Sequence, residues 1–564
     1  MFTVNSRSRY RMFRESIFLT LGVLLAGVVF SSSDTVKSQN PEECLARDYG
    51  KGSVVCVCND QHCDYSPPVE PVPKNKYIVY TSNQAGLRFK KEVKTYTNAK
   101  SGKHCFVPPN DDICEHDWDT SYRVCGVLVP SHLIPSANIF VEPSILYQEV
   151  MGWGGAVTDS TVINVANMTK TLQEHLLRSY YSTDGLDYNF ARVPMGGTDF
   201  STRFYSYIDT LEHVVDCVDH SLKDFKLAPE DIDLKIPFLK RARQLRNDLK
   251  LFSSTWVLPT AYKENNSYMG FLGFIRKEVY QLLADYYIKF FDLYKERGLS
   301  FWGVSSTNEP FIAMAEFSIP GTPGNLWTPE DLGYWIRDHL GPTIKRSDHS
   351  HLKLITLDDQ RSLLRVVPQI VRDAETSQYV DGFATHFYMD FKNNTYLLDN
   401  VNEQFPDKFI MVTEACVGAL GIFLGDWSNA ETYADDIIQN MNHHVTGWVD
   451  WNMVLDLQGG PNVAAARDAP ILNNNGTEFL KQPLYYAIGH FSKFVPPGSY
   501  RIYSSQCNEN DLVTQVAFER PDGGIVVVIL NRSEQQIQRK IIDCKKNNIN
   551  LDLSPRSITT VLYW

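Results

Sequence analysis

The chain lacks the excess of positive charge that a nucleic-acid-binding protein needs. Its 564 residues include 54 Lys and Arg against 66 Asp and Glu, a formal net charge of −12 at pH 7, whereas binding to nucleic acid requires a basic face. It also lacks internal repeats and low-complexity tracts, and 43% hydrophobic residues is ordinary globular composition. We therefore expect a folded protein that binds no nucleic acid. At this length it contains a large barrel with a satellite domain, or two to three domains.

Beyond residue 30 no apolar run is long enough to cross a bilayer. The one long run, Ile17–Phe30, follows four arginines and precedes Ser31–Ser33. This layout is typical of a signal peptide, and an uncleaved signal anchor is the alternative. We predict a signal peptide over residues 1–33 and a soluble mature protein in the secretory pathway.

Cysteine is scarce beyond the first quarter of the chain. Seven of the 11 cysteines fall in that quarter, namely Cys44, Cys56, Cys58, Cys63, Cys105, Cys114 and Cys125. In an oxidising lumen this crowding predicts a segment stapled by disulfides, with one thiol left over or paired elsewhere. Zinc binding is the alternative for Cys56-Val-Cys58, but no matching His or Cys pair follows at zinc spacing.

Five N-x-S/T sequons agree with passage through the secretory pathway. We take Asn167, Asn265, Asn393 and Asn475 as glycosylation candidates, and a fifth sequon begins at Asn531. Each sequon alone arises often by chance, so only their number supports secretion.

Between about residues 150 and 490, short apolar segments alternate with long amphipathic helical stretches. This rhythm is typical of a parallel sheet with crossover helices. We expect eight strands, at Glu149–Thr158, Tyr188–Gly196, Leu249–Trp256, Ser300–Glu309, Leu352–Gln360, Asp381–Tyr388, Lys408–Val417 and Val445–Asn452. Eight such units predict an α/β fold of the (β/α)8 TIM-barrel class, and an open doubly wound sheet is the competing fold.

Helix starts are signalled by capping patterns. Thr171-Leu-Gln-Glu174 predicts a capping box, and Thr328-Pro329-Glu330-Asp331 predicts a helix with Pro at its first position. Asp358 and Asp359 lie at the end of the fifth predicted strand, where we expect them to cap a helix N-terminus.

The barrel's flanks have alternating, turn-rich sequences typical of strands. Leu512–Phe518 and Ile525–Leu530 enclose a turn at residues 521–524, and Ser557–Trp564 ends the chain. We expect an all-β sandwich domain built from both chain ends. The expected limits are residues 34–148 for the cysteine-rich part, with an insertion around 85–130, then 149–492 for the barrel and 493–564 for the C-terminal part.

Motifs of other enzyme classes are missing. Gly152-Trp-Gly154-Gly155 lacks the third glycine of a dinucleotide-binding loop and fits a tight strand end. The chain has no G-x-S-x-G elbow of a serine hydrolase. His349 and His351 lie in a polar loop, where we expect them to be solvated, and no metal-ligand constellation is found. We therefore expect no cofactor and no metal.

Two of the predicted strands end in a carboxylic acid. The fourth ends in Asn308-Glu309-Pro310 and the seventh in Thr413-Glu414. In a barrel the carboxyl ends of all strands converge, so these acids should face one another. Other strand ends supply Arg192, Asp199, Trp256, His386, Tyr388 and Trp451. Two acids among polar and aromatic side chains indicate a sugar-binding pocket.

A carboxyl pair can break a glycosidic bond. One acid protonates the leaving oxygen, while the other faces the oxocarbenium-like centre with its negative charge. At a separation of about 5–5.5 Å the second acid attacks directly, and the anomeric configuration is retained. The first acid must be protonated near the working pH, and the charge of its neighbour raises its pKa.

From about Cys44 to its end, the chain resembles family 30 of the glycoside hydrolases, specifically the lysosomal acid β-glucosidases (glucosylceramidases). The most specific stretches are Glu414-Ala-Cys-Val-Gly418 and Gly489-His-Phe-Ser-Lys-Phe494, and Asn308-Glu-Pro310 marks the wider clan. The resemblance implies hydrolysis of glucosylceramide to glucose and ceramide by double displacement, in sphingolipid degradation.

The resemblance also implies a role for each matching residue. Glu309 would be the acid/base and Glu414 the nucleophile. Asp199, Trp256, Asn308 and Trp451 would bind the sugar, while Arg192, His386 and Tyr388 would form the nucleophile's surroundings. Disulfides would join Cys44 to Cys56 and Cys58 to Cys63.

The family's substrate is presented at a membrane, with a saposin-type activator and anionic lipid as further partners. We accordingly expect a protein of the lysosome lumen, delivered by the secretory pathway and peripherally associated with membrane, or else secreted.

The chain departs from the family at several places. Cys105, Cys114 and Cys125 lie in an N-terminal insertion without a family counterpart. Ala261 replaces a tryptophan beside the pocket mouth, the stretch from Val463 to Ala466 replaces bulky and polar residues, and the loop from Ala419 to Asp426 is shorter. These changes bear on the aglycone and the activator rather than on the reaction.

Two other functions stay open. A related family member would cut another β-glycoside, such as a β-xyloside or a glucosylated sterol. A binding relative would keep the pocket but lack catalysis, which the presence of both Glu309 and Glu414 argues against.

Overall fold

The computed structural model describes residues 43–96, 121–124, 127–130, 138–208, 222–311, 322–418, 421–463, 467–505, 512–543 and 546–564. The predicted signal peptide and Cys105, Cys114 and Cys125 lie outside the described residues. Among the helices that are described, none is long and apolar enough to cross a membrane.

Eight parallel strands close into a barrel in the order in which they follow one another along the chain. They are β8 (Gly152–Ala156), β9 (Phe190–Met195), β10 (Lys250–Thr255), β11 (Gly303–Ser305), β12 (Lys353–Gln360), β13 (Gly382–His386), β14 (Phe409–Glu414) and β15 (Val445–Asn452). Each lies within one of the eight predicted segments, so the predicted TIM barrel is confirmed. The strands are almost wholly buried, as expected when helices cover a parallel sheet.

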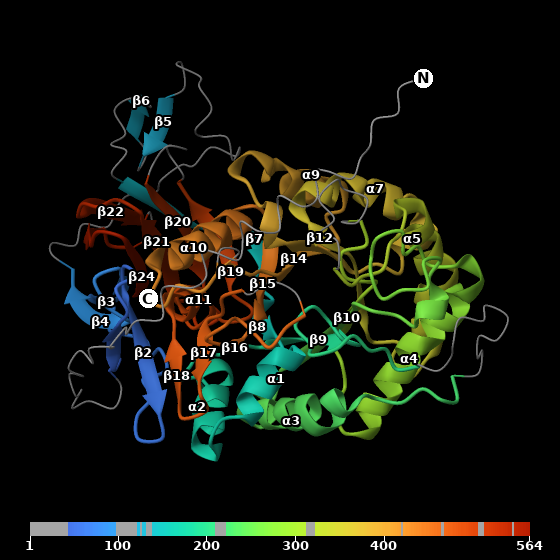
Figure 1. Ribbon diagram of the computed structural model, residues 1–564. Coiled ribbons are helices and arrows are strands. Elements are labelled where there is room, and N and C mark those ends of the chain that lie inside the picture. The colour runs from blue at the N-terminus through green and yellow to red at the C-terminus, as the bar shows by residue number, and fades with distance from the viewer. Residues whose placement is uncertain are drawn as a thin grey trace, which may run out of the picture. The chain divides into compact units, whose positions relative to one another are not determined.

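The helices connect successive strands or follow the barrel (Figure 1). They are α1 (Asp159–Ala166), α2 (Lys170–Tyr181), α3 (Ile236–Leu245), α4 (Tyr280–Glu296), α5 (Pro329–Trp335), α6 (Gly341–Arg346), α7 (Val367–Ile370), α8 (Ala374–Ser377), α9 (Tyr396–Gln404), α10 (Trp427–Asn442) and α11 (Pro483–Ser492). A π-helical turn, η3 (Glu230–Lys235), precedes α3.

One of the two predicted helix starts is correct. Thr328 caps α5, because its side chain accepts a hydrogen bond from the backbone N–H of Asp331. The predicted start of α2 is wrong by two residues: Thr169, not Thr171, is the cap, and it accepts from the N–H of Leu172 at 3.2 Å. Both threonines precede the same apolar periodicity, so the pattern alone does not choose between them.

A nine-stranded sheet combines the two ends of the chain, as predicted. Its order is β23-β22-β7-β19-β20-β21-β24-β3-β4. From the N-terminal part come β3 (Lys76–Asn83), β4 (Lys90–Thr95) and β7 (Asn138–Glu149), and from the C-terminal part β19 (Tyr500–Ser504), β20 (Val513–Glu519), β21 (Ile525–Asn531), β22 (Ile537–Asp543), β23 (Ile549–Leu553) and β24 (Ser557–Tyr563). In Figure 1 the blue strands β3 and β4 lie beside the red strand β24.

The two faces of this sheet pack separately. Val527 and Val561 belong to a hydrophobic cluster of the sheet itself, whereas Val526, Val528 and Leu562 belong to the main core shared with the barrel. This division follows from the alternation of side chains along a strand. The last helix, α11, joins the two parts: its buried His490 hydrogen-bonds Thr560 on β24 at 2.7 Å and Ser82 on β3 at 2.9 Å.

A five-stranded sheet has a composition that the sequence did not indicate. It pairs β1 (Ala46–Asp48) and β2 (Val54–Asn59) with β18 (Glu478–Lys481), β17 (Ile471–Asn474) and β16 (Val454–Asp456), which follow the eighth barrel strand. Disulfides join Cys44 to Cys56 and Cys58 to Cys63, as the family resemblance implied. A separate hairpin consists of β5 (Ser121–Val124) and β6 (Val127–Pro130).

Candidate active site

Glu309 and Glu414 lie on the same side of the barrel and face the same space. Glu414 ends β14, and Glu309 lies four residues beyond β11. Three atoms lie within 4.8 Å of one another: a carboxylate oxygen of Glu309, a carboxylate oxygen of Glu414 and a ring nitrogen of His386. The side chain of Glu414 is buried and that of Glu309 is half-buried. The structure therefore brings together the two acids that the strand ends predicted.

Arg192, on β9, donates a hydrogen bond to Glu414. Its Nη1 donates to Oε2 of Glu414 at 2.5 Å, and its Nη2 donates to Asn308 at 2.9 Å and to Asp358 at 3.0 Å. Burial disfavours the charged guanidinium, but the two carboxylates outweigh it and raise the pKa of Arg192. Glu414 thus has a permanent positive charge against one oxygen.

The other oxygen of Glu414 accepts a hydrogen bond from the phenol of Tyr388 at 2.7 Å. Burial, with the charge of Glu414, raises the pKa of Tyr388 well above its usual value. Tyr388 therefore stays a neutral donor, and each oxygen of Glu414 accepts a hydrogen bond, one from Arg192 and one from Tyr388.

His386 lies between two carboxylates. Its Nδ1 is 3.0 Å from Oε1 of Glu309, and its Nε2 is 3.1 Å from Oδ1 of Asp358. Burial lowers the pKa of a histidine, but the charges of Glu414, Asp358 and Glu309 outweigh it and raise the pKa of His386 to about 10. The ring is therefore protonated at acidic and neutral pH.

Glu309 has different neighbours from Glu414. Burial is the main influence on it and raises its pKa, which the hydrogen bond and charge of His386 only partly offset. Gln360 also donates to its Oε1, at 2.9 Å. The environment thus favours a protonated Glu309, as a general acid requires.

Asp358 belongs to this cluster, and the prediction that it caps a helix is wrong. It accepts from Ser254 and Thr413, each at 2.6 Å, as well as from Arg192. The register of β12 against β13 shifts between residues 357 and 359, and Asp358 has φ of +50°. This bulge turns the carboxylate into the barrel, where Arg192 holds its pKa below the usual range against burial.

Asp359 does not cap a helix either. Its carboxylate accepts from the backbone N–H of Phe311 at 2.9 Å and of Gln360 at 2.8 Å. Burial and the charge of Glu309 raise its pKa to about 8. It therefore ties the segment after Glu309 to the end of β12.

Backbone strain coincides with the acid cluster. Glu309 has φ of +43°, in the left-handed region that residues with side chains rarely adopt. Its N–H donates to the carbonyl of Asp358 at 2.9 Å, which helps to hold this conformation. Conformations of this kind cost on the order of 1–3 kcal/mol and gather at functional sites.

Two tryptophans form an aromatic wall. The rings of Trp256 and Trp451 stack with centroids 4.6 Å apart and planes at 11°. The guanidinium of Arg192 lies 4.6 Å from the centroid of Trp256. Both tryptophans are buried, so all the aromatic residues predicted for the pocket lie within or beside the cluster.

Asp199 presents a buried carboxylate oxygen that has no hydrogen-bond partner among the residues described. Burial raises the pKa of Asp199 to about 8, and the charges of Glu414 and Glu309 add to this effect. Such an oxygen is a strong candidate for a ligand contact, since buried polar atoms are normally satisfied.

The structure describes some of the positions at which the chain departs from the family. Ala261 is half-buried in a short 3-10 turn at Thr260–Tyr262, just after β10. Val463 is exposed, and its N–H donates to the carbonyl of Asp199 at 2.9 Å. Ala419 and Ala466 lie outside the described residues.

Among the described residues, two groups of side chains lie close enough together to be compared with a metal centre. In the first, Glu309, His386 and Glu414, both ring nitrogens of His386 lie within hydrogen-bond distance of carboxylates, those of Glu309 and Asp358. In the second group, Cys58, Cys63 and Asp64, the two cysteines form a disulfide with each other and so offer no thiolate to a metal ion.

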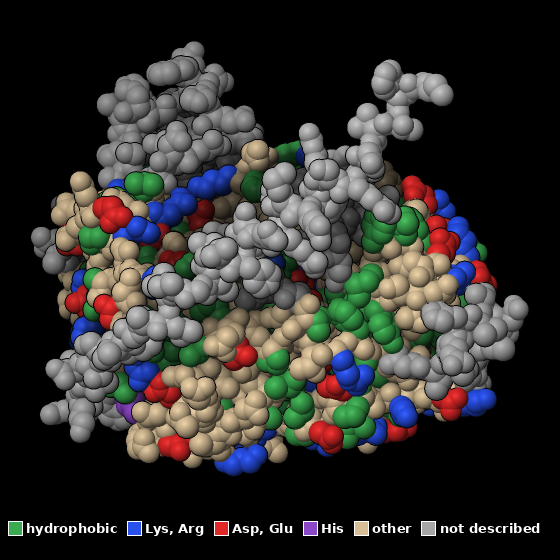
Figure 2. Space-filling model, in the orientation of Figure 1, with side chains coloured by type: hydrophobic (Ala, Val, Ile, Leu, Met, Phe, Trp, Pro, Cys, Tyr) green, Lys and Arg blue, Asp and Glu red, His purple; other side chains and the backbone are tan. Residues whose placement is uncertain are grey.

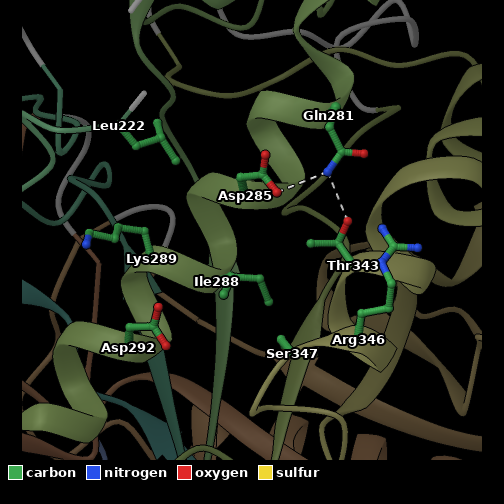
Figure 3. A pocket seen from close by; sticks show the side chains of 9 residues that line it. All are labelled: Leu222, Gln281, Asp285, Ile288, Lys289, Asp292, Thr343, Arg346 and Ser347. Atoms are coloured by element: carbon green, nitrogen blue, oxygen red, sulfur yellow. Dashed lines mark hydrogen bonds between the residues drawn. The ribbon is translucent and has the colours of Figure 1, made fainter. Parts of the chain in front are cut away.

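A cavity of about 340 Å³ lies away from the acid pair, beside α4 and α6 (Figure 3). Gln281 donates there to Asp285 and Thr343, each at 3.0 Å. None of its lining residues belongs to the acid cluster. His349 lies close by and is buried against Asp292 at 2.9 Å, so its predicted solvation is wrong.

The sequons differ in accessibility. Asn167, Asn393 and Asn475 are exposed, whereas the side-chain nitrogen of Asn265 donates to the carbonyls of Met269 and Phe271. Asn531 is fully buried and donates to Ser554. Burial makes Asn531 a poor glycan acceptor in the folded chain.

Comparison with known proteins agrees with the geometry. Residues 150–495 match the glycosyl hydrolase family 30 TIM-barrel domain, and residues 498–561 match the family's β-sandwich domain. The chain is 36% identical over 517 residues to lysosomal acid glucosylceramidase of Mus musculus, covering 89% of this chain and 92% of that protein.

Solved structures show the same fold. SrfJ from Salmonella typhimurium superposes with a TM-score of 0.73 at 24% identity, and the endo-β1,6-glucanase BT3312 with 0.69 at 22%. Each match covers 86% of this chain and 99% of the other. The acid pair, the barrel and these matches together show that the chain belongs to glycosyl hydrolase family 30 and is a glycoside hydrolase.

Proposed function

We propose that the protein is a retaining β-glucosidase that hydrolyses glucosylceramide to glucose and ceramide. The observation that carries the proposal is the carboxylate pair of Glu309 and Glu414, whose nearest oxygens lie within 4.8 Å. Inverting enzymes hold their two carboxyl groups about 6.5–9.5 Å apart to admit a water, and retaining enzymes hold them about 5–5.5 Å apart. The short spacing of Glu309 and Glu414 therefore supports direct attack.

In the proposed reaction Glu414 attacks the anomeric carbon while Glu309 protonates the departing ceramide oxygen. A covalent glucosyl–enzyme bond forms as the glycosidic bond breaks. Esterification removes the charge of Glu414, so the pKa of Glu309 falls and the same residue can take a proton from water. Attack of that water on the anomeric carbon releases glucose and restores both acids.

The sugar contacts of the proposal follow from the unpaired groups around the pair. Asn308 accepts from Arg192 through its Oδ1, which leaves its amide N–H groups to donate to a sugar hydroxyl. The free oxygen of Asp199 would accept from hydroxyls farther round the ring. Trp256 and Trp451 would pack against the sugar's apolar face.

A lipid substrate is supported by exposed apolar side chains on the loops that follow the barrel strands. Phe271 and Leu272, after β10, are 62% and 58% exposed, and Phe391 after β13 is 55% exposed. Phe423 after β14 is also exposed. Loops after the strands surround the catalytic end of a barrel, and Figure 2 shows hydrophobic side chains gathered over the region of β10 and α5. These residues would contact the membrane that presents glucosylceramide.

The place of action belongs to the same proposal. The lysosomal mouse relative supports delivery to the lysosome lumen, and the predicted signal peptide and exposed sequons fit that route. A saposin-type activator and anionic lipid are proposed partners at the membrane.

The test uses the full-length protein from a secretory host. We expect it to release glucose from glucosylceramide in vesicles, faster when the vesicles contain anionic phospholipid, and to release the β-anomer of glucose first, as detected by proton NMR. A panel with an aryl β-glucoside, a β-xyloside and a glucosylated sterol defines its range. Cleavage of the xyloside or sterol alone would identify the related-glycosidase alternative, and no cleavage of any glycoside would identify the binding alternative.

A further inference from the structure

We propose that Asp159, the first residue of α1, is a positioning residue that acts through Ser201 to fix the carboxylate of Asp199. The inference rests on the proposed function, in which Asp199 binds the sugar. Asp159 itself contacts Ser201, Tyr205 and Lys235, none of which belongs to the acid cluster.

Asp199 lies in a turn that two hydroxyls shape. The N–H of Thr198 donates to Oγ of Ser201 at 2.8 Å, and the N–H of Phe200 donates to Oγ1 of Thr198 at 2.9 Å. These bonds enclose Asp199 on both sides in the chain. The carbonyl of Asp199 also accepts from the N–H of Val463 at 2.9 Å, so Ser201 is one of the groups that set the direction of the Asp199 carboxylate.

Asp159 holds Ser201. The Ser201 hydroxyl donates to Oδ2 of Asp159 at 2.6 Å, and the phenol of Tyr205 donates to the same oxygen at 3.1 Å. Asp159 is 2% exposed and Ser201 is fully buried, so water does not compete for these bonds. A hydrogen bond to a group that takes part in an ion pair is stronger than one between neutral groups.

Lys235 supplies the charge that a buried carboxylate needs. Its Nζ lies 2.7 Å from Asp159 and 3.7 Å from Asp231, with no exposed side-chain surface. Tyr294 on α4 donates to Asp231 at 2.6 Å. The turn of Asp199 is thus linked, through Asp159, to a network of ion pairs and hydrogen bonds that spans α1, η3 and α4.

This arrangement has a consequence for specificity. A hydrogen bond to a sugar hydroxyl is lost when its acceptor moves by about 1 Å. Removing the Ser201 hydroxyl deletes the side-chain link between this turn and Asp159, although Asp199 itself and the bond from Val463 to its carbonyl are unchanged. We expect kcat/KM for a β-glucoside to fall about tenfold in Ser201→Ala.

A double-mutant cycle separates positioning from general damage. Purified full-length Ser201→Ala, Asp199→Asn and the double variant are compared on an aryl β-glucoside. If Ser201 acts through Asp199, Ser201→Ala reduces kcat/KM about tenfold in the wild type and less than twofold in the Asp199→Asn background. Tyr205→Phe, which removes one donor to Asp159 and little volume, should show a smaller loss with the same dependence on Asp199.

The control is Ser179→Ala. Its buried hydroxyl donates to the carbonyl of His175 at 2.7 Å within α2, and we expect unchanged kcat/KM. Equal losses from Ser201→Ala in both backgrounds would overturn the inference alone. An unchanged kcat/KM in Asp199→Asn would overturn the sugar contact of the proposed function, and the inference with it.

Discussion

Nδ1 of His386 lies 3.0 Å from Oε1 of Glu309, so a protonated ring touches the acid that is proposed to donate a proton. With its pKa raised to about 10, His386 carries a positive charge throughout the acidic and neutral range. That charge lowers the pKa of Glu309, while burial raises it by more. The two effects together set the pH at which Glu309 loses its proton.

Replacing His386 by Asn should move the alkaline limb of the pH profile upward. Without the adjacent cation, the pKa of Glu309 rises further, so the acid stays protonated to higher pH. We expect the alkaline limb of kcat/KM on an aryl β-glucoside to shift up by on the order of one pH unit. In Gln360→Met, which removes only a neutral donor from Glu309, the shift should be smaller. A limb that moves down in His386→Asn would refute this tuning.

Glu414→Gln should abolish turnover and keep sugar binding. The amide retains the shape of the side chain but cannot attack the anomeric carbon, so kcat should fall on the order of 10⁴-fold or more. Calorimetry with a glucose-like inhibitor should still detect binding. The matched control is Glu403→Gln, an exposed position on α9, where activity should be unchanged. Turnover near the wild-type rate in Glu414→Gln would exclude its role as nucleophile.

Glu309→Ala should be rescued by azide. Loss of a general acid costs on the order of 10²–10⁴-fold, and least for aryl glucosides whose leaving groups need no proton. Azide can enter the space of the lost carboxylate and attack the anomeric carbon of the glucosyl–enzyme, releasing Glu414 and forming β-glucosyl azide. Chromatography detects that product. Its absence at high azide concentration would count against Glu309 as acid/base.

Stability should fall as pH rises from about 4 to 7, in part through Asp468. Burial raises the pKa of this residue from 3.8 to about 7, so within that window the folded chain binds a proton that the unfolded chain has lost. The stabilisation is complete below the unfolded pKa and disappears as pH rises through the folded one. Between these values each pH unit removes up to about 1.4 kcal/mol.

Asp468→Asn tests this linkage. Gln482 and Asn429 donate to the carboxyl at 2.7 and 3.3 Å, and a side-chain amide keeps one acceptor for them. Denaturant unfolding at pH 5 and pH 7 should show a smaller difference in unfolding free energy than in the wild type. An undiminished difference would show that other groups cause it.

The barrel could be predicted because its strands are apolar runs that end abruptly in polar residues. Glu309 and Glu414 stood out for the same reason, since a charge directly after a buried strand is unusual. The place of Asp358 in the acid cluster was not predicted because it depends on a β-bulge and a left-handed backbone conformation. The local sequence pattern indicates neither feature. Asp358 and Asp359 look alike in sequence, yet one faces Arg192 and the other binds backbone N–H groups.

The strand pairing of the five-stranded sheet could not be predicted from the sequence, for a different reason. β2 pairs with β18, with Cys58 opposite Phe479. Pairing at so long a separation depends on the completed barrel, not on either strand's own residues. We expected strands in the cysteine-rich segment, which contains β2, but none over β16, β17 and β18.

The most direct test of the account is covalent labelling with a cyclitol epoxide that mimics glucose, followed by peptide mapping. The reagent reacts with the carboxylate that reaches the anomeric position. We predict one modified residue, Glu414, and loss of activity in step with labelling. Modification of any other residue, or full labelling with activity retained, would contradict the central claim.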